Sequence, residues 1–563
     1  MKIVIVGGVA GGASAAARIR RLNEQAEIVV FERSGHISYA NCGLPYYIGD
    51  VITDPDDLTL QTPESFWQRF RVSMKVNHEV TAIHTDRKTV SVKNLITGEV
   101  FEESYDKLIL SPGARPAKPR FVGVGLEKLF TLRTVEDALH IKEYINKHKP
   151  KSAVLAGGGF IGLELAENLR ELGMDVTIVQ MLPQLMETFD PDMASFIHAE
   201  MRKHGVKLAL GQAVEGFEEK DGGIDVLIKG GSRLHADMAM LAIGVTPDTA
   251  LAKEAGLELG IRGSIVVNDR METSVPDIYA AGDAVQVKHY VTGADALISL
   301  AGPANKQGRI IADNICGGDS RYSGSLGSSV IKIFDLTAAT TGINETNARN
   351  AGLDVDTVIL SPQNHSGYYP GGKVMTIKVV FEKGTYRLLG AQIIGYEGVD
   401  KRIDVIATAI HVGMKATGLK DLDLAYAPPY SSAKDPVNMA GFMIDNISKG
   451  ILKQWHIEDE PNLPRDGSVT LLDTRTVKEY SGGYAEDFKN IPVDELRERI
   501  DEVEKGKPVY VMCQSGVRSY IACRILEGLG YEAYNFTGGY RFYSAVMNDR
   551  ALIEAATDCG MDK

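Results

Sequence analysis

Short apolar runs alternate with segments of helical periodicity from Met1 to Gly317. The apolar run at 3–6 is followed by a helical segment at 13–22, and the run at 153–156 by one at 163–172. Alternating strands and helices of this kind are typical of α/β domains with parallel sheets. The repeated strand–glycine–helix pattern predicts two units of the same kind in this part of the chain.

The remainder of the chain has other patterns. Strand-like runs within 374–394 precede a helical segment at 401–412, which predicts an α+β domain over 325–447. A polar, Pro-containing stretch predicts a linker at 448–466. Residues 467–563 have a small α/β pattern of their own.

Composition limits the possible functions. The chain has 563 residues and a net charge of −13. A single core stops growing at roughly 250–300 residues, so several domains are expected. The acidic balance argues against a nucleic-acid partner, and an anionic substrate would need a local basic patch. The apolar runs are too short to cross a bilayer and the N-terminus lacks a signal-peptide pattern, so no membrane association and a cytoplasmic location are expected.

The chain has five cysteines, and no two have the CxxC spacing of a zinc ribbon. Neither a disulfide scaffold nor a metal site is predicted. Cys316, Cys523 and Cys559 stand in no motif and are expected to be inert. Cys42 and Cys513 stand in distinctive segments.

The first glycine-rich turn, 7–12, lies between a strand and a helix. Backbone amides at such a turn bind a pyrophosphate, and the helix N-terminus favours its negative charge. Glu32 ends the next strand, where a carboxylate can accept from a ribose hydroxyl. Val9 replaces the central glycine, so this turn alone does not specify the nucleotide.

Two later segments indicate the nucleotide by resemblance. Residues 273–283 resemble the second FAD motif of two-dinucleotide flavoproteins, whose aspartate, here Asp283, holds the ribityl chain. Ser111-Pro112-Gly113 resembles the crossover motif that leaves the FAD domain. The three motifs in this order imply FAD as cofactor.

The second glycine turn, 157–162, has the full GxGxxG pattern. The following strand ends at Gln180, where NAD sites usually place an acid and NADP sites have arginines nearby. No positive charge follows at 181–183, so NADH is favoured over NADPH. Phe160 matches the aromatic residue that covers the flavin face in related enzymes.

Cys42 follows Glu32 by ten residues, and no second cysteine stands four or five positions on. A lone thiol near a flavin must cycle through a mixed disulfide, a persulfide or a sulfenic acid. A helix start at this point is expected to lower the pKa of the thiol and favour thiolate. Cys42 is therefore the predicted redox centre.

The segments at 7–12, 38–47 and 426–438 resemble those of coenzyme A-disulfide reductases in the pyridine-nucleotide flavoprotein superfamily, and the resemblance covers residues 1–447. It implies Rossmann-like domains for FAD (1–112 and 248–324) and NAD(P)H (113–247). It also implies a dimerisation domain over 325–447 and a homodimer.

The resemblance further implies site residues. The implied cofactor contacts are Gly7, Gly8, Ala10, Gly11, Glu32, Arg33, Ser111, Gly113, Gly157, Gly159, Phe160, Gly162, Gln180, Gly244, Asp283 and Ala301. Positions that contact coenzyme A match Ser14, Arg18, Arg21, Ser38, Asn41, Asn305, Tyr368 and Lys434. Tyr368 and Tyr426 are candidate catalytic residues beside Cys42. Tyr426 and Tyr430 bracket two prolines, and one of them is a candidate to reach the other subunit's cysteine.

Arg18 and Arg21 lie on one face of the first helix at i, i+3. One interpretation is a seat for coenzyme A phosphates, which bind charged donors well. The other is a solvated basic face.

The C-terminal region contains a second distinctive cysteine. Cys513 follows a short strand at 509–512 and begins the loop 513–519 ahead of a helix. The inward-pointing amides of such a loop stabilise a thiolate or a persulfide anion. The loop and residues 471–475 resemble those of rhodaneses.

The six residues from Cys513 to Arg518 match the size of a rhodanese loop, whereas a phosphatase loop needs one more. Arg518 is a candidate substrate-binding residue. The segment 485–489 departs from the rhodanese pattern, which leaves the substrate mouth of this domain undefined.

The preferred hypothesis is an NADH-dependent reductase of coenzyme A persulfide, coenzyme A disulfide or polysulfide. Electrons would pass from NADH through FAD to sulfur on Cys42, and Cys513 would handle sulfane sulfur. One alternative is an NADH oxidase or peroxidase. The related single-cysteine peroxidases, however, carry a histidine in the first glycine turn, where this chain has Ala10. Another is a redox sensor without turnover, which would need only one of the two cysteine segments.

Overall fold

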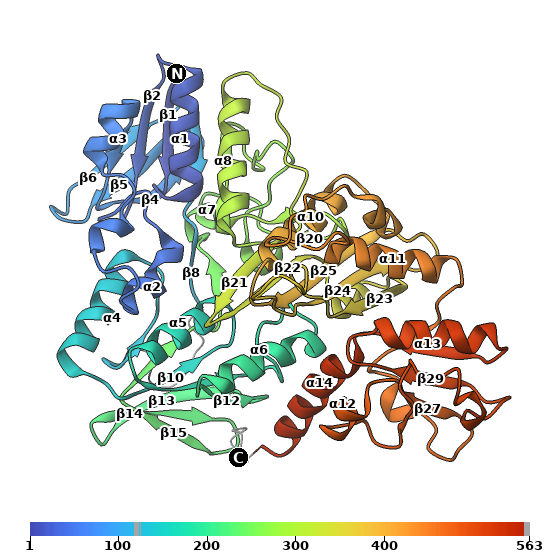
Figure 1. The fold of residues 1–563 in the computed structure, drawn as a ribbon. Helices are drawn as coiled ribbons and strands as arrows, with labels where there is room; N and C mark the ends of the chain where they lie inside the picture. Colours follow the sequence, from blue (N-terminus) through green and yellow to red (C-terminus); the bar gives the residue numbers. More distant parts are fainter. Residues whose placement is uncertain (118–122, 124, 557–563) are drawn as a thin grey trace. The chain divides into compact units, whose positions relative to one another are not determined.

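The computed structural model describes residues 1–117, 123 and 125–556. The chain forms two compact units (Figure 1). Unit 1 comprises Met1–Leu182 and Gly205–Gly327, and unit 2 comprises Pro183–His204 and Ser328–Lys563. Cys559 lies outside the described residues. Within the described part, no helix is long and apolar enough to span a membrane.

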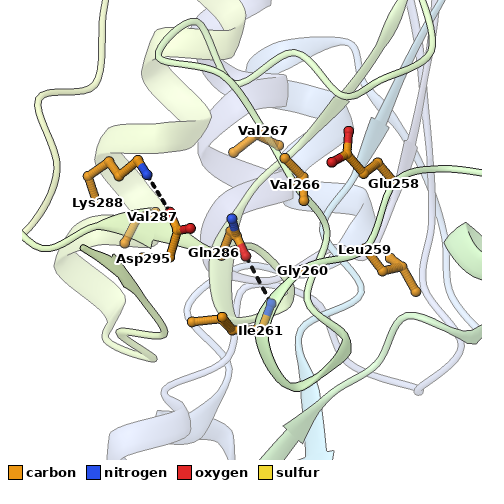
Figure 2. A pocket seen from close by; sticks show the side chains of 10 residues that line it. All are labelled: Glu258, Leu259, Gly260, Ile261, Val266, Val267, Gln286, Val287, Lys288 and Asp295. Carbon is orange, nitrogen blue, oxygen red and sulfur yellow. Dashed lines mark hydrogen bonds and ion pairs between the residues drawn. The ribbon is translucent and has the colours of Figure 1, made fainter. Parts of the chain in front are cut away.

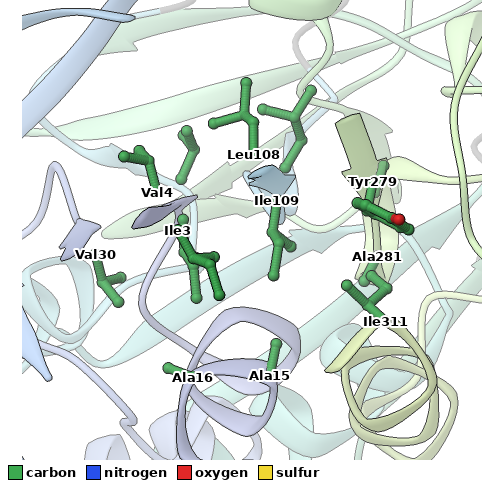
Figure 3. Close-up of a cluster of buried hydrophobic side chains, with 14 of the residues drawn as sticks. Ile3, Val4, Ala15, Ala16, Val30, Leu108, Ile109, Tyr279, Ala281 and Ile311 are labelled. Atoms are coloured by element: carbon green, nitrogen blue, oxygen red, sulfur yellow. The ribbon is translucent and has the colours of Figure 1, made fainter. Parts of the chain in front are cut away.

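The first parallel sheet of unit 1 has the strand order β18-β7-β1-β2-β3. Its strands are Lys2–Val6 (β1), Glu27–Phe31 (β2), Ser73–Lys75 (β3), Lys107–Leu110 (β7) and Ile278–Ala280 (β18). Helices α1 (Ala10–Leu22) and α8 (Ala301–Ile315) pack on it, and Figure 3 shows Ile3, Ala15, Ile109 and Ile311 in the shared core. Because a Cβ on Gly308 would lie 2.4 Å from the Gly11 carbonyl oxygen, only glycine permits this helix contact.

The second parallel sheet repeats this design, which confirms the two predicted α/β units. Its order is β12-β11-β10-β16-β9. The strands are Leu129–Phe130 (β9), Ser152–Ala156 (β10), Asp175–Gln180 (β11), Lys207–Leu210 (β12) and Met238–Leu241 (β16), and the helices are Val135–His148 (α4) and Phe160–Glu171 (α5).

Smaller antiparallel elements complete unit 1. One three-stranded sheet consists of His78–His84 (β4), Thr89–Asn94 (β5) and Val100–Ser104 (β6), and another consists of Val214–Lys220 (β13), Gly223–Ile228 (β14) and Arg233–Ala236 (β15). Two further strand pairs are Ala114–Pro116 (β8) with Val245–Pro247 (β17), and Val287–Lys288 (β19) with Asp295–Ala296 (β20). The short helices are Asn41–Gly43 (η1), Leu44–Ile48 (α2), Pro55–Leu58 (η2), Pro63–Phe70 (α3), Ala250–Glu254 (α7), Ile261–Gly263 (η3) and Gly282–Ala284 (η4).

Unit 2 contains an antiparallel sheet in the order β21-β22-β25-β24-β23, as predicted for an α+β domain. Its strands are Ser329–Ile333 (β21), Leu336–Gly342 (β22), Val355–Leu360 (β23), Thr376–Glu382 (β24) and Leu388–Gly395 (β25). The helices are Glu345–Asn350 (α9), Val399–His411 (α10), Ala416–Asp421 (η5) and Pro436–Ser448 (α11).

Helix α6 (Pro191–Lys203) belongs to unit 2, although it falls inside the predicted NAD(P)H-binding segment 113–247. A buried ion network explains this placement. Lys378 Nζ on β24 lies 2.7 Å from Asp192 and 3.1 Å from Asp190. Because buried charges are tolerated only when paired, the network holds the start of α6 against the β21–β25 sheet.

The C-terminal sheet is parallel, in the order β26-β30-β29-β27-β28. Its strands are Gln454–Trp455 (β26), Thr470–Asp473 (β27), Lys489–Asn490 (β28), Val509–Met512 (β29) and Ala533–Phe536 (β30). The helices are Glu460–Asn462 (η6), Val477–Ser481 (α12), Ile500–Glu502 (η7), Val517–Gly528 (α13) and Gly539–Glu554 (α14).

The segment predicted as a linker, 448–466, is partly a structural element of this sheet. Strand β26 pairs with β30. Trp455 is 1% exposed and packs against Phe536, with 4.3 Å between the ring centroids and the rings tilted by 39°. The Thr537 hydroxyl donates to the Ile359 carbonyl and accepts from its N–H, which ties β30 to the edge strand β23. The C-terminal domain is therefore fixed to the β21–β25 sheet by hydrogen bonds.

His456 makes a second such contact, with Nε2 3.1 Å from Asp356. Burial lowers the pKa of His456, but the hydrogen bond and charge of Asp356 outweigh it, so this pKa is raised. The stabilisation is therefore present below about pH 6.5, the ordinary value, and is lost as the pH rises through the raised pKa.

We expect the thermal midpoint of unit 2 to fall further between pH 6 and pH 9 in the native protein than in His456→Gln. A contribution of 1 kcal/mol shifts the midpoint by about 2–4 °C in a domain of this size. Calorimetry at both pH values measures the effect, with the exposed His140→Gln as control. Equal pH dependence in the native protein and His456→Gln would contradict the assignment.

Candidate active sites

The two glycine turns of unit 1 have the same backbone geometry. Gly7 has φ +97° and Gly157 has φ +114°, in the region that favours glycine. A Cβ at Gly7 would lie 2.1 Å from the Ser111 carbonyl oxygen, and one at Gly157 would lie 2.3 Å from that of Ala242. Each turn is thus a cradle of backbone atoms that a side chain would fill.

Each cradle is closed by the residue that ends the neighbouring strand. The Gly8 N–H donates to Glu32 Oε2 at 2.8 Å, and the Gly158 N–H donates to Gln180 Oε1 at 3.2 Å. Glu32 is buried and negatively charged, whereas Gln180 is neutral. The two sites therefore present different groups to a ribose.

Cys42 lies in η1, just ahead of α2, and is accessible to solvent. Its pKa is raised by burial and by the charge of Glu164, against a lowering by Arg133. The expectation that a helix start lowers this pKa is corrected here, because α2 has only five residues and desolvation by the surrounding protein outweighs its dipole.

A hollow of about 470 Å³ in unit 1 collects five of the predicted substrate contacts. Its lining comprises Ala13, Ser14, Ala17, Arg18, Arg21, Ser38, Leu60, Gln61, Phe66, Arg69, Phe70, Asn305 and Arg309. The Ser14 hydroxyl donates to the Asn305 side chain at 2.5 Å, which links α1 to α8. We refer to this site as the arginine pocket.

The arginines of this pocket differ in their pairing. Arg18 Nε lies 2.8 Å from Asp313, so its charge is shared with a carboxylate. Arg21, Arg69 and Arg309 make no ion pair with a carboxylate of the described chain. Three arginines without a carboxylate partner thus line one hollow of a protein of net charge −13, an arrangement that suits an anion.

Cys513 in unit 2 is fully buried and lies at the start of a narrow loop. Its Sγ accepts hydrogen bonds from the Gly516 N–H at 3.1 Å and the Ser519 hydroxyl at 3.2 Å. The Tyr540 N–H at the start of α14 donates to the Cys513 carbonyl at 2.7 Å. Donors directed at the sulfur can stabilise a thiolate or a persulfide anion.

Comparison with known proteins identifies the family. Residues 1–308 match Pyridine nucleotide-disulphide oxidoreductase, residues 328–436 match the dimerisation domain of that family, and residues 460–545 match the Rhodanese-like domain. The chain belongs to the pyridine nucleotide-disulphide oxidoreductases.

Relatives support this assignment over the whole length. The coenzyme A disulfide reductase of Staphylococcus aureus (strain JH9) is 37% identical over 442 residues, which are 78% of this chain and 99% of that protein. Reduced CoADR-RHD from Bacillus anthracis is 48% identical, with TM-score 0.95 over 98% of each chain. A NAD-dependent persulfide reductase from A. fulgidus is 37% identical, with TM-score 0.91 over 96% of this chain and 100% of that one.

The architecture of this oxidoreductase is the predicted one. It consists of two dinucleotide-binding folds, a dimerisation domain and a rhodanese-like domain. The predicted FAD and nicotinamide cofactors are also confirmed. The cradles at Gly7 and Gly157 fit these two dinucleotides, since both expose backbone at the N-terminus of a helix.

The remaining predicted cofactor contacts lie at helix starts and at the β8–β17 pair of unit 1. Ala10, Phe160 and Ala301 are the first residues of α1, α5 and α8, and Gly113 and Gly244 adjoin the β8–β17 pair with positive φ. Arg33 Nη1 pairs with Asp248 at 2.7 Å. A Cβ at Gly11 would lie 2.6 Å from Ser111 Oγ and one at Gly162 would lie 2.1 Å from the Gly157 carbonyl oxygen, whereas one at Gly159 would meet nothing within 4 Å.

Arg133 was not identified from the sequence, because it stands in no motif. Its Nη2 lies 2.7 Å from Asp283, the aspartate expected to hold the ribityl chain. Asn41 donates to the Arg133 carbonyl at 3.0 Å and accepts from Arg133 Nη1 at 3.2 Å. Arg133 therefore connects the cysteine segment to the second FAD motif.

Glu164 is a second residue that local patterns did not indicate. It follows Phe160 by one helical turn, and its charge acts on both Cys42 and Tyr46. Burial, together with the charge of Glu167, raises the pKa of Glu164 to about 7. A carboxyl group that titrates near neutral pH beside the thiol can exchange protons during turnover.

In the dimerisation domain, the Tyr368 and Tyr426 hydroxyls lie 2.7 Å apart. Tyr426 also receives a hydrogen bond from Ser366 at 3.4 Å, which helps to lower its pKa, whereas the pKa of Tyr368 is raised. Tyr430 is exposed and so is Lys434. These side chains lie on an open surface of unit 2.

Another hollow, of about 670 Å³, is lined by residues 258–261, 266–267, 286–288 and Asp295 (Figure 2). Gln286 accepts from the Ile261 N–H at 3.0 Å, and Lys288 pairs with Asp295 at 2.6 Å. It shares no residue with the predicted sites.

Proposed function

We propose that this enzyme is an NADH-dependent reductase of coenzyme A persulfide, with coenzyme A disulfide and polysulfide as related acceptors. The arginine pocket carries the proposal, because its three unpaired arginines suit the phosphates of coenzyme A. Ser38 belongs both to this pocket and to the segment that continues to Cys42. The relatives named for coenzyme A disulfide and for persulfide support the same substrate class.

The proposed chemistry takes place at Cys42. The Cys42 thiolate attacks the inner sulfur of coenzyme A persulfide, hydrosulfide leaves, and a mixed disulfide between Cys42 and coenzyme A forms. FAD, when bound, would supply the two electrons from NADH that reduce this disulfide to two thiolates. Arg133 favours the thiolate of Cys42, and Glu164 is placed to exchange a proton.

The other assignments follow from the same interpretation. The neutral Gln180 at the second turn and the absence of positive charge after it favour NADH over NADPH. The exposed Tyr368–Tyr426 pair suits a homodimer in which it faces the partner's cysteine. Cys513 accepts and presents sulfane sulfur. An oxidase or peroxidase role is less well supported, since Ala10 provides no acid or base.

The test is removal of the unpaired charges. Arg21→Gln with Arg69→Gln should raise KM for coenzyme A persulfide by about 10-fold or more and change KM for a small alkyl persulfide little, because a hydrogen bond to a charged group is worth about 1.5–3 kcal/mol. Steady-state kinetics with both substrates measures this.

Lys229→Gln, which removes one exposed cation elsewhere in unit 1, is the control. An equal effect of the double variant on both substrates would show that these arginines form only a solvated face.

A further inference from the structure

The rhodanese-like domain contains an ion pair between Arg518 and Glu479, close in sequence to the Cys513 loop. Arg518 is the second residue of α13, directly after the loop that holds the Cys513 sulfur. Its two terminal nitrogens each donate to one oxygen of Glu479 at 2.7 Å, a two-point pairing that is geometrically specific. The cation that the loop offers to a substrate is therefore already bound to a carboxylate.

Further hydrogen bonds hold the Glu479 carboxylate in place as the partner of Arg518. Its Oε2 also accepts from the N–H and the hydroxyl of Thr476, at 2.9 and 2.8 Å, in a capping box at the start of α12. The pairing lowers the pKa of Glu479 to about 2, with Arg518 as the main cause. Glu479 stays ionised at any pH at which the enzyme would act, and Arg518 stays neutralised.

A second arginine near the loop, Arg475, is neutralised as well. Arg475 is 1% exposed and pairs through Nη2 with Asp473 at 2.7 Å. Its guanidinium also lies over the ring of Tyr540 at 3.8 Å. Neither arginine therefore adds net positive charge to the site of Cys513.

The helices beside the loop carry exposed apolar side chains. Val517 and Ile521 on α13 are 61% and 42% exposed, and Val477 on α12 is 62% exposed. The Glu479–Arg518 pair joins these two helices. A donor reaching Cys513 thus meets hydrophobic side chains and a neutral ion pair.

We propose that Glu479 determines the charge selectivity of the Cys513 site, so that it accepts sulfur from organic persulfides with an uncharged chain in preference to dianionic thiosulfate. Thiosulfate carries both negative charges on the small group whose sulfur must meet the thiolate, so its approach needs an uncompensated cation, whereas the charge of a polysulfide is spread along its chain. Glu479 removes that cation, while Val517 and Ile521 suit an alkyl chain. This inference deepens the proposed function, since it rests on Cys513 as a carrier of sulfane sulfur.

The transfer step is balanced without a further reactant. The Cys513 thiolate attacks the outer sulfur of R–S–SH, the S–S bond of the donor breaks, and a new S–S bond forms on Cys513. R–S⁻ leaves and takes up the proton of the transferred sulfur, so the products are the Cys513 persulfide anion and R–SH. With thiosulfate the same step would release sulfite.

The experiment measures the rate at which Cys513 gains one sulfur, by intact-protein mass, in full-length enzyme carrying Cys42→Ser. The donors are thiosulfate and N-acetylcysteamine persulfide, and the readout is the ratio of their rate constants. Glu479→Gln should raise the thiosulfate-to-persulfide ratio at least tenfold, because glutamine keeps the hydrogen-bond acceptor of the capping box and frees the charge of Arg518.

Two further variants separate charge from structure. Glu479→Gln with Arg518→Gln should return the ratio to within threefold of the parent value. Arg518→Gln alone, which leaves Glu479 unbalanced, should lower the ratio and remains informative if Glu479→Gln does not fold. Glu502→Gln, which breaks the ion pair with Arg499 elsewhere in the same domain, should leave the ratio unchanged.

The proposal is overturned if the parent enzyme reacts with thiosulfate as fast as with the persulfide. It is also overturned if folded Glu479→Gln keeps the parent ratio, or if the increase persists in the double variant. NADH oxidation with coenzyme A persulfide, measured in enzyme with Cys42 intact, tests the proposed function separately, because that activity depends on Cys42.

Discussion

Replacing Cys42 by serine is expected to abolish turnover of the sulfur acceptor, by about 10³-fold or more, while FAD stays bound and reducible by NADH. A hydroxyl cannot form a mixed disulfide. Among the cysteines of the described chain, Cys42 is the one whose pKa responds to the charge of Asp283 in the second FAD motif and to that of Arg133, the ion-pair partner of Asp283. The cofactor cradles at Gly7 and Gly157 do not involve the thiol, so nucleotide binding should persist.

Stopped-flow absorbance separates these two steps, since it follows reduction by NADH and reoxidation by the acceptor in turn. Cys316→Ser is the matched control. Cys316 follows α8 and stands in no cofactor or substrate motif, so serine there should leave turnover close to normal. Substantial acceptor turnover in Cys42→Ser would refute covalent catalysis at this residue.

Cys513→Ser is expected to cause the second largest loss of turnover, and only with polysulfide as the sulfur donor. Oxidation of NADH with free coenzyme A persulfide should remain largely intact, whereas turnover with polysulfide should fall by at least 10-fold. Cys513 lies in unit 2 with donors directed at its sulfur, and that domain has no dinucleotide turn. It can load and present sulfur, whereas reduction requires Cys42.

The decisive comparison uses both substrates with both single variants. Cys42→Ser should be inactive with either substrate, and Cys513→Ser with polysulfide alone. If Cys513→Ser is as inactive as Cys42→Ser towards the free persulfide, Cys513 belongs to the core redox path and this division of labour is wrong.

The local motifs were predictable because their chemistry is encoded in a few neighbouring residues. Gly7 and Gly157 adopt positive φ where a Cβ would collide with a facing carbonyl, so the sequence must place glycine there. The loop from Cys513 to Ser519 is determined in the same way, since its sulfur and its donors lie within seven residues. The order of strands and helices in both dinucleotide folds followed from hydrophobic periodicity.

Domain limits were less predictable, because they depend on buried contacts between distant segments. Helix α6 joins unit 2 through Lys378, which is 186 residues from Asp192. The predicted linker includes β26, whose Trp455 is buried beside Phe536. Neither contact leaves a periodic signal in the sequence.

The sequence by itself determined the two dinucleotide turns, the family and the candidate cysteines Cys42 and Cys513, since each depends on residues close together in the chain. The tertiary structure alone decided which charges are free. It pairs Arg18 with Asp313 and Arg518 with Glu479, and it leaves Arg69 and Arg309 unpaired in one pocket with Arg21. The physical reason is that a charge is compensated by whatever the fold brings within a few ångströms, and those partners stand 295 and 39 residues away for Arg18 and Arg518.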